Sequence, residues 1–552
     1  MIESVRKKLS SYKEVYFDGT CYYFNKEKLL VKFSGHFYRF QQFNEKYLTE
    51  QNTPLISIVS PTEEVFDVQL SHYYQPKIKA DGFKLKIKSD ASIKVETSNM
   101  RGFRYAIQVL SSLINLEENQ IVLPIIEVNH EPSFEIRGVI EGFYGIPWTA
   151  EDRIDVMHYM GRQRLNTYMY APKDDELQRK RWREPYPEAK LEEFKQLLDV
   201  AEEEEIDFYY MISPGNDIDY TQPSEVEVLT EKLQSMINLG IRYFGLLLDD
   251  IDYILKGNAK LRFKDAASAH AYLINEVDHY LATVLTDYEL VVCPTEYDNR
   301  FASQYLDELT QAVAPHVPFF WTGPSTLARE IRTSDIARCA ETYNRPIIVW
   351  DNTPVNDFEN DHELLFLSPF ENRSPQLADS AYNVRGFVSN PMAQWEASKL
   401  TVGHMSHYLW NSEGFNFIGD WETVLEGLAG KTSLEALKIF ARFNPNRHTR
   451  QVYPDNYLRK VDQQDVAFIE SKLTELRQAC EQLTNLSDES LLQQLKPWLD
   501  RALQDITFWN VIRTKDQDAI HKLAKELSGS SYRIGLDLPM KYYERHFATE
   551  TE

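Results

Sequence analysis

The stretch Phe244-Gly245-Leu246-Leu247-Leu248-Asp249-Asp250-Ile251-Asp252 is an apolar run of strand length that ends in adjacent carboxylates. An apolar run without polar alternation is typical of a parallel strand that is buried on both faces. In parallel α/β proteins, the loops that follow such strands usually carry the chemistry. The stretch therefore predicts that Asp249 and Asp250 lie at the functional end of a parallel sheet.

Strand-like and helix-like segments alternate eight times around this stretch. The expected strands cover residues 136–140, 165–170, 206–212, 241–248, 288–292, 317–321, 346–350 and 386–389. Helical patterns fill the gaps, for example at 150–163, 190–204, 224–239 and 266–285. Eight βα units in about 280 residues predict an α/β fold, a (β/α)8 TIM barrel. A doubly wound open sheet is the alternative, but no Gly-rich phosphate loop follows the first strand.

Each predicted strand is followed by polar, aromatic, Gly or Pro residues. In chain order these tips are Glu141-Gly142-Phe143-Tyr144-Gly145, Ala171-Pro172-Lys173-Asp174-Asp175, Ser213-Pro214-Gly215-Asn216-Asp217, Asp249-Asp250, Pro294-Thr295-Glu296-Tyr297, Trp321-Thr322-Gly323, Trp350-Asp351-Asn352 and Ser389-Asn390-Pro391. Because the carboxyl ends of barrel strands converge on one face, the tips are expected to line one pocket.

Two further domains are expected on either side of the barrel, which we assign to residues 131–412. Residues 1–130 indicate a small α+β domain with short strands and one amphipathic helix running from near Ser98 to Leu113. Residues 413–552 indicate a helical bundle, with apolar residues at helical spacing over 466–483 and 489–523. The pattern leaves open whether this bundle shapes a substrate groove or mediates dimerisation.

Composition argues against several classes of partner. The net charge of −24 would repel nucleic acid and anionic membranes. Residues 1–8 contain no apolar leader, and no window approaches a membrane span, so a cytoplasmic location is expected if Met1 is the natural start. The four cysteines show no metal-binding or redox spacing and are expected to be reduced thiols; they are Cys21, Cys293, Cys339 and Cys480.

The paired carboxylates Asp249 and Asp250 suit acid and base chemistry. Two neighbouring carboxyl groups in one site cannot both ionise cheaply, so their environments tend to make one a proton donor and the other a charged stabiliser. Glycoside cleavage needs such a pair. For a lone Asp-Asp, a helix cap or a solvated strand end would be favoured, and it is the polar tips of the other strands that favour catalysis here. With Asp252 the pair could also ligate Mg²⁺ or Ca²⁺. His404 and His407 mimic a metal pair, but packing is favoured there because barrel helices lie away from the strand tips.

The tip motifs resemble glycoside hydrolase family 84. The runs that carry the resemblance are Arg137-Gly138-Val139-Ile140-Glu141-Gly142-Phe143-Tyr144-Gly145-Ile146-Pro147-Trp148, Leu165-Asn166-Thr167-Tyr168-Met169-Tyr170-Ala171-Pro172-Lys173-Asp174-Asp175 and Asp249-Asp250. The family contains O-GlcNAcases and bacterial β-N-acetylglucosaminidases, some of them called hyaluronidases. The resemblance implies cleavage of terminal β-linked N-acetylglucosamine (GlcNAc) with retention, with the substrate's own acetamido oxygen as nucleophile and with no metal or organic cofactor.

The resemblance also implies residue roles. Asp249 would hold the acetamido N–H and stabilise the oxazoline intermediate, and Asp250 would be the general acid and then the general base. Burial or the neighbouring charge is expected to keep Asp250 protonated at neutral pH. Tyr297 would orient the acetamido group and Trp350 would form a pocket wall. The sugar-binding residues would be Gly142, Lys173, Asn352, Asp357 and Asn390.

Two rival functions stay open at this point. One is a glycan-binding or glycoprotein-binding module that kept the pocket and lost turnover. The other is an endo-acting, hyaluronidase-like hydrolase, which would need a groove that runs past the pocket. The expected partner is a GlcNAc-bearing glycoprotein or oligosaccharide, and the group attached to the sugar is not determined by the motifs.

Overall fold

The computed structural model describes residues 2–26, 28–35, 55–59, 62–252, 254–298, 302–359, 361–446, 448 and 456–548. The chain divides into two compact units, Met1–Glu135 with His407–Asn416 and Ile136–Ser406 with Phe417–Glu552. Across these described ranges, no helix combines the length and the apolarity that a membrane crossing requires.

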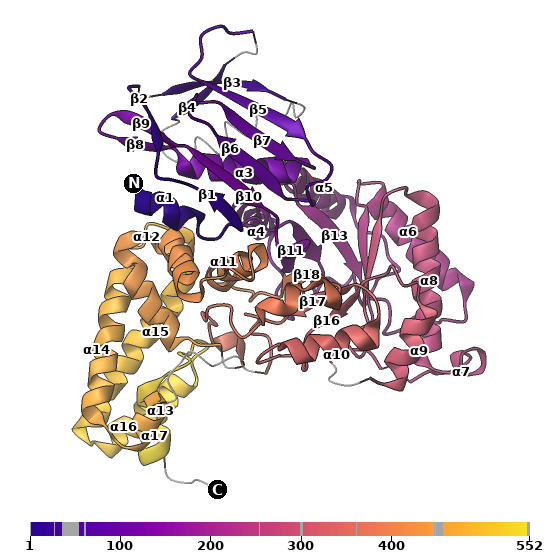
Figure 1. Ribbon diagram of the computed structural model, residues 1–552. Helices are drawn as coiled ribbons and strands as arrows, with labels where there is room; N and C mark the ends of the chain where they lie inside the picture. Colours follow the sequence, from indigo (N-terminus) through magenta and orange to yellow (C-terminus); the bar gives the residue numbers. More distant parts are fainter. Residues whose placement is uncertain are drawn as a thin grey trace. The chain divides into compact units, whose positions relative to one another are not determined.

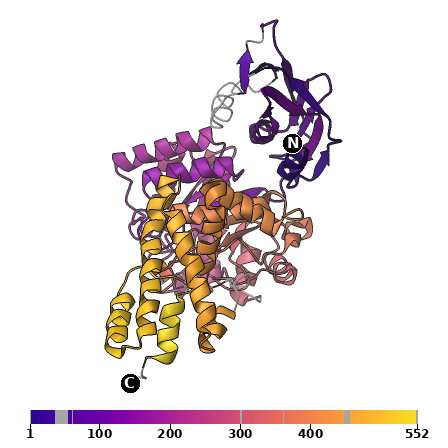
Figure 2. The same cartoon turned by 90° about the vertical axis from the view of Figure 1, so that its left-hand side faces the viewer.

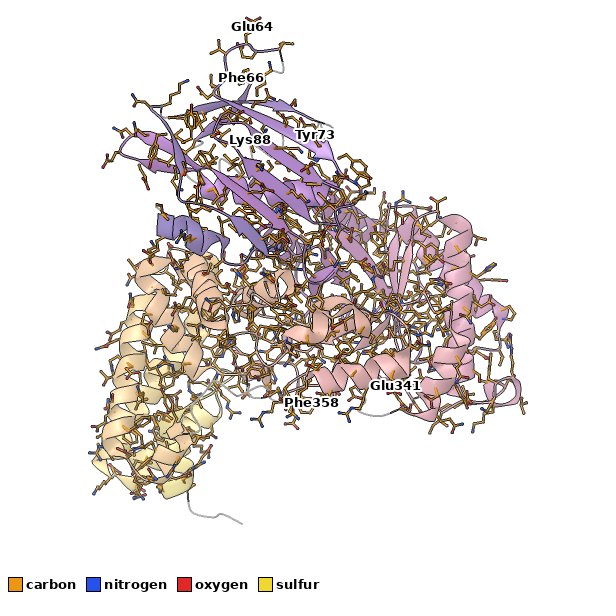
Figure 3. The ribbon with its side chains drawn as sticks, in the orientation of Figure 1. Glu64, Phe66, Tyr73, Lys88, Glu341 and Phe358 are labelled. Carbon is orange, nitrogen blue, oxygen red and sulfur yellow. The ribbon has the colours of Figure 1, made fainter. Side chains whose placement is uncertain are left out.

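The first unit is built on a mixed seven-stranded sheet with the order β1-β10-β6-β7-β5-β3-β4. Helix α3 (Met100–Leu113) packs against β6 and β7 and begins at Asn99, whose side chain accepts a hydrogen bond from the Gly102 N–H. A three-stranded sheet, β2-β9-β8, and helix α1 (Ile2–Leu9) complete the unit. Tyr73, at the end of β5, is exposed (Figure 3). The strands are β1 (Glu14–Tyr16), β2 (Cys21–Phe24), β3 (Leu29–Ser34), β4 (Ile56–Val59), β5 (Val68–Tyr74), β6 (Phe83–Ile87), β7 (Ile93–Thr97), β8 (Asn115–Glu117), β9 (Gln120–Pro124) and β10 (Ile126–His130).

The second unit contains a closed barrel of parallel strands (Figure 1). The strands follow one another in chain order, and β18 closes the barrel by pairing with β11. They are β11 (Ile136–Ile140), β12 (Thr167–Tyr170), β13 (Asp207–Ile212), β14 (Tyr243–Leu247), β15 (Glu289–Cys293), β16 (Phe319–Trp321), β17 (Ile347–Asp351) and β18 (Val384–Ser389). Each lies where a strand is predicted, with ends that differ by at most two residues. The (β/α)8 TIM barrel prediction is therefore confirmed.

Helices follow the barrel strands at the predicted places. Helix α4 begins with a capping box in which Thr149 and Asp152 bond reciprocally to each other's backbone N–H, and this fixes the end of the loop that follows β11. The helices of this region are α4 (Ala150–Arg162), α5 (Glu188–Glu203), α6 (Pro223–Ile237), α7 (Ala259–Arg262), α8 (Ala266–Val284), α9 (Gln304–Ala312), α10 (Thr333–Tyr343) and α11 (Trp395–Trp410), with short 3₁₀ turns at Asp361–Glu363, Pro375–Ala378 and Ser380–Tyr382.

Apolar side chains fill the inside of the barrel below the strand tips. They come from alternating positions on successive strands and include Ile140, Met169, Met211, Leu247, Val291 and Phe320. Such layers make the barrel a packed core and leave room for a ligand only at the carboxyl ends of its strands.

The C-terminal part of the second unit is helical, and its helices lie side by side in both views (Figures 1 and 2). One prediction is wrong in detail, because the helix expected over 489–523 is two helices. Lys515 has a left-handed backbone (φ 62°), and Asp516 caps a new helix by accepting the Ala519 N–H. The helices are α12 (Phe417–Phe443), α13 (Asn456–Asp462), α14 (Val466–Leu483), α15 (Glu489–Thr514), α16 (Gln517–Ser528) and α17 (Leu538–His546).

Candidate active site

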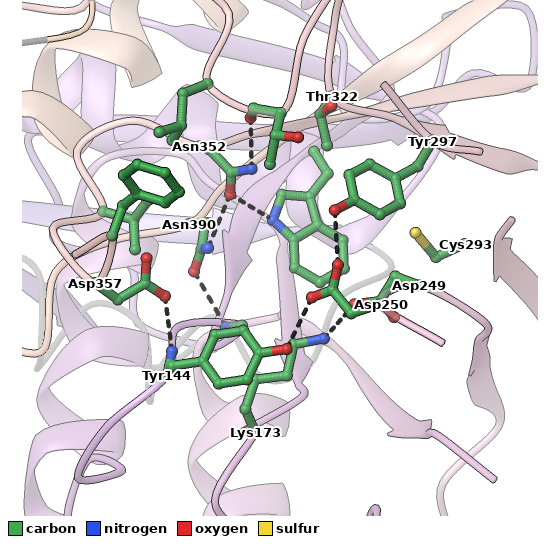
Figure 4. A pocket seen from close by; sticks show the side chains of 16 residues that line it. Tyr144, Lys173, Asp249, Asp250, Cys293, Tyr297, Thr322, Asn352, Asp357 and Asn390 are labelled. Atoms are coloured by element: carbon green, nitrogen blue, oxygen red, sulfur yellow. Dashed lines mark hydrogen bonds and ion pairs between the residues drawn. The ribbon is translucent and has the colours of Figure 1, made fainter. Parts of the chain in front are cut away.

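A cavity of about 330 Å³ opens at the carboxyl ends of the barrel strands. Its lining contains every site residue predicted from the sequence (Figure 4), namely Gly142 after β11, Lys173 after β12, Asp249 and Asp250 after β14, Tyr297 after β15, Trp350, Asn352 and Asp357 on and after β17, and Asn390 after β18. The structure thus brings together residues that are up to 248 positions apart in the chain.

Both carboxylates of the Asp249-Asp250 pair face this cavity. Neighbouring side chains on an extended strand point to opposite faces, so the pair needs a change of backbone direction. Asp250 provides it with a left-handed conformation, φ 50°. A non-glycine residue pays about 1–2 kcal/mol for that conformation, and strain of this kind is concentrated at functional sites.

Asp249 is 5% exposed and forms a buried ion pair through Oδ2 with the ammonium of Lys173, which is 3% exposed. Burial alone would lower the pKa of Lys173, but the charge of Asp249, its hydrogen bond and the nearby Tyr144 together outweigh burial and raise that pKa above its usual value. The second oxygen, Oδ1, is buried and accepts no hydrogen bond from any residue in the described part of the chain. Asp249 therefore presents to the cavity one oxygen acceptor that no residue in the described part of the chain occupies.

Asp250 lies between two phenol groups and is exposed to the cavity. The hydroxyls of Tyr144 and Tyr297 each donate a hydrogen bond to its carboxylate at 2.8 Å (Figure 4). Burial by itself would raise the pKa of Asp250, but these two hydrogen bonds and the nearby positive charges hold it below its usual value. The structure thus differs from the expectation of a neutral Asp250, because the sequence pattern did not reveal two donors for the anion.

An amide cluster joins three strand tips on one side of the cavity. Asn352 Oδ1 accepts hydrogen bonds from the Trp350 indole at 3.0 Å and from the Asn390 amide at 2.9 Å. Asn390 Oδ1 in turn accepts the Gly142 N–H at 3.2 Å. The strands β11, β17 and β18 that carry these residues are neighbours because the barrel closes between β18 and β11. The cluster fixes the orientation of both amides and of the indole.

Gly142 is required by the close approach of Trp350. A Cβ on residue 142 would lie 2.4 Å from Cζ2 of the indole, so we expect Gly142→Ala to displace the ring and to lower kcat/KM on an aryl β-N-acetylglucosaminide by about tenfold. Gly427→Ala is the control, since a Cβ there meets no atom within 4 Å. Equal activity of the Gly142 variant and wild type would show that the indole position does not matter.

Asp357 lies opposite the paired carboxylates in the same cavity (Figure 4). Its Oδ2 accepts the Tyr144 N–H at 2.7 Å, and burial raises its pKa above the usual value. Tyr144 therefore touches Asp357 through its backbone and Asp250 through its hydroxyl. A partly buried carboxylate with a second free oxygen is suited to accepting hydrogen bonds from sugar hydroxyls.

Sequence reasoning assigned no role to several residues that build or line the cavity. Glu141 is fully buried and accepts hydrogen bonds from the Arg153 guanidinium at 2.8 and 2.9 Å, the Tyr168 hydroxyl at 2.6 Å and the Trp148 N–H at 3.1 Å. It therefore anchors both ends of the loop that carries Gly142 and Tyr144. Its place at a strand tip beside Gly142 was a usable signal. The unassigned lining residues include Tyr144, Cys293, Thr322 and Phe358, of which Phe358 is 49% exposed (Figure 3).

Two metal sites were considered from the sequence, one at Asp249, Asp250 and Asp252 and one at His404 and His407. Among the described residues, no three His, Cys, Asp or Glu side chains are placed to hold a metal ion. Asp252 is exposed and binds the Ile254 N–H and the Lys256 ammonium. His404 is buried; its Nδ1 accepts the Phe370 N–H at 3.0 Å and its Nε2 lies 2.9 Å from the Phe417 carbonyl oxygen. His404 is thus a packed core residue.

Comparisons with known proteins agree with this geometry. The model of a family described as beta-N-acetylglucosaminidase matches residues 137–442, more than half of the chain. Protein O-GlcNAcase of Rattus norvegicus is 37% identical over 271 residues, which are 48% of this chain and 29% of the rat protein, and the Mus musculus protein matches equally well. The chain thus spans less than a third of the length of these curated relatives.

Solved structures extend the likeness beyond the barrel. A mutant of the Thermobaculum terrenum O-GlcNAc hydrolase is 29% identical with a TM-score of 0.66, covering 75% of this chain and 94% of that one. CpGH84B is 23% identical with a TM-score of 0.78, covering 97% and 99%, and it supports the fold alone. With the strand-tip motifs, the confirmed barrel and the family match in agreement, the chain belongs to glycoside hydrolase family 84, the β-N-acetylglucosaminidase family.

Proposed function

We propose that the chain is a retaining exo-β-N-acetylglucosaminidase of the O-GlcNAcase type, which removes terminal β-linked GlcNAc by substrate-assisted catalysis. The observation that carries the proposal is Asp249 Oδ1, which is buried and accepts no hydrogen bond from the described residues. A buried acceptor without a donor costs about 1–3 kcal/mol, and an acetamido N–H of a bound sugar supplies the missing donor. The other oxygen of Asp249 is taken up by the ion pair with Lys173.

In the first step the acetamido carbonyl oxygen attacks the anomeric carbon, and the bond to the leaving oxygen breaks. The positive charge that develops on the acetamido group is stabilised by Asp249, which accepts its N–H. Asp250 delivers a proton to the leaving oxygen. It must first exchange one of its tyrosine hydrogen bonds for that oxygen, because its low pKa in this structure depends on those two donors.

In the second step a water molecule attacks the anomeric carbon of the oxazoline from the face that the leaving group has vacated. Asp250, now a carboxylate, takes a proton from this water. The C1–O bond of the oxazoline breaks and the acetamido group is restored. Two inversions at one carbon give net retention, and no protein side chain needs to form a covalent bond.

Support for sugar recognition comes from the other lining residues. Asp357 can accept hydrogen bonds from two hydroxyls, and the amides of Asn352 and Asn390 are held in place by their mutual hydrogen bond. Trp350 offers an apolar ring beside them, as sugar faces require. The cavity of about 330 Å³ is at the small end of the range for ligand pockets, which favours a single terminal sugar.

The test varies the nucleophile that the substrate carries. We expect 4-nitrophenyl β-N-acetylglucosaminide to be hydrolysed and its N-trifluoroacetyl analogue to react at least about tenfold more slowly, because fluorine withdraws electrons from the attacking oxygen. NMR of the first-formed sugar should show the β anomer. Equal rates for the two substrates, or an α-anomeric first product, would refute substrate assistance with retention.

A further inference from the structure

Arg179 lies beside the cavity and lacks, among the described residues, the carboxylate partner that the two arginines near it in the chain have. The loop after β12 carries three arginines. Arg181 pairs with Glu176 and Glu184. Arg183 pairs with Asp217 and Glu225. Arg179 has no carboxylate within ion-pair distance among the described residues, and its Nε–H is buried without a hydrogen-bond acceptor.

Arg179 is linked to the reacting group through Tyr144. Its guanidinium lies over the Tyr144 ring, 5.4 Å from the ring centroid. The hydroxyl of the same ring donates to Asp250, the group assigned to the leaving oxygen (Figure 4). Arg179 is partly exposed, whereas Lys173, the other cation near this ring, is buried and paired with Asp249. Of these two cations, Arg179 is therefore the one that is accessible from solvent.

The charge of Arg179 also acts on Asp250. Two tyrosine hydrogen bonds and the charge of Lys173 lower the pKa of Asp250 most, and the charge of Arg179 adds a smaller lowering, which disfavours the protonated form that a general acid needs. A negative charge on the substrate that neutralises Arg179 would remove this effect. The chain has a net charge of −24, yet this guanidinium beside the cavity has no carboxylate partner in the described part of the chain, so its charge is available to a ligand.

We propose that Arg179 binds a carboxylate on the aglycone, the group whose oxygen leaves, so that the enzyme prefers GlcNAc linked to an acidic unit. The proposal rests on the proposed function and specifies its substrate class. A guanidinium presents parallel N–H donors that match a carboxylate. Such a carboxylate is found in a uronic acid of an oligosaccharide and in an acidic side chain next to a glycosylated Ser or Thr.

The test compares two aryl glycosides that differ in one group, 4-carboxyphenyl and 4-carbamoylphenyl β-N-acetylglucosaminide. The readout is the ratio of their kcat/KM values, because any general effect of a mutation on the cavity cancels in that ratio. We expect Arg179→Gln to lower the carboxylate-to-amide ratio about fivefold, as for a partly exposed charge pair, and Arg179→Lys to restore part of it.

Lys180→Gln is the matched control. Lys180 is the next residue, is exposed and has no ion pair in the described part of the chain, so its loss removes the same charge from the same loop. A carboxylate-to-amide ratio that falls equally in both variants would overturn this inference alone. So would an unchanged ratio in Arg179→Gln, provided that the wild type hydrolyses both glycosides. A wild type that hydrolyses neither glycoside would overturn the proposed function and the inference with it.

A second pair of substrates distinguishes the sources of the carboxylate. One is GlcNAc β-linked to glucuronate, and the other is an O-GlcNAc peptide with Glu beside the modified Ser. The substrate whose kcat/KM falls more in Arg179→Gln is the one whose carboxylate lies where Arg179 binds it. If the rates on both fall no more than the rate on the 4-carbamoylphenyl glycoside, the inference is refuted.

Discussion

Asp250→Asn is expected to lower kcat on an aryl β-N-acetylglucosaminide by about 10²–10⁴-fold, the range for loss of a general acid–base group. An amide can neither protonate the leaving oxygen nor take a proton from water. The loss should be larger for a substrate with a poor leaving group, such as a glycopeptide, than for 4-nitrophenyl, because the latter needs less protonation. Steady-state kinetics on both substrates measures this difference.

The control for this substitution is Asp252→Asn. Asp252 lies two residues away and is exposed, and its contacts are confined to its own loop. Activity of this variant should stay close to that of wild type, and both variants should keep the wild-type melting temperature. An Asp250→Asn enzyme with full activity on both substrates would remove Asp250 from the acid–base role.

Asp249→Asn is expected to lower both activity and stability. The activity should fall about 10²–10³-fold, because the developing positive charge on the acetamido group loses its counter-charge. The stability should fall by about 3–5 kcal/mol, because the ammonium of Lys173 stays buried without its ion-pair partner. Enzyme kinetics and urea unfolding, measured on the same preparation, separate the two effects.

The double variant Asp249→Asn/Lys173→Met decides which effect is primary. Removing the buried ammonium removes the unpaired charge, so stability should recover most of the loss while activity stays low. Recovery of activity together with stability would mean that Asp249 acts only by satisfying Lys173. No recovery of either would mean that Lys173 is not the source of the instability.

The barrel was predictable because its pattern is local. The strands β11 and β14 are short, continuous apolar runs, which are typical of buried parallel strands and not of helices. The polar residues that follow each run mark the end of the buried segment. The closed barrel then forces the strand tips to one face, so cavity membership of Lys173 and Asn390 followed from their places after strands. The ends of helices were harder to predict where a capping residue or a left-handed residue ends the helix, as Lys515 does after α15.

The protonation state expected for Asp250 was not predictable from the same pattern. It depends on hydroxyl donors from Tyr144 and Tyr297, which reach Asp250 from 106 and 47 residues away. The role of Glu141 in holding its loop was not predicted for a related reason, because its partners Arg153 and Tyr168 lie on the following helix and strand. Hydrogen-bond geometry of this kind is set by packing and has no signature in the spacing of residue types.

The sequence by itself determined the barrel, the order of its strands and the set of residues at their tips, because hydrophobic periodicity and the rule for parallel strands act along the chain. Only the tertiary structure decided how those residues are charged and oriented. The left-handed backbone of Asp250 turns both carboxylates into one cavity. In the described part of the chain, one oxygen of Asp249 accepts no hydrogen bond and Arg179 has no carboxylate partner. These features arise from distances between side chains of different strands, which exist only once the barrel has closed.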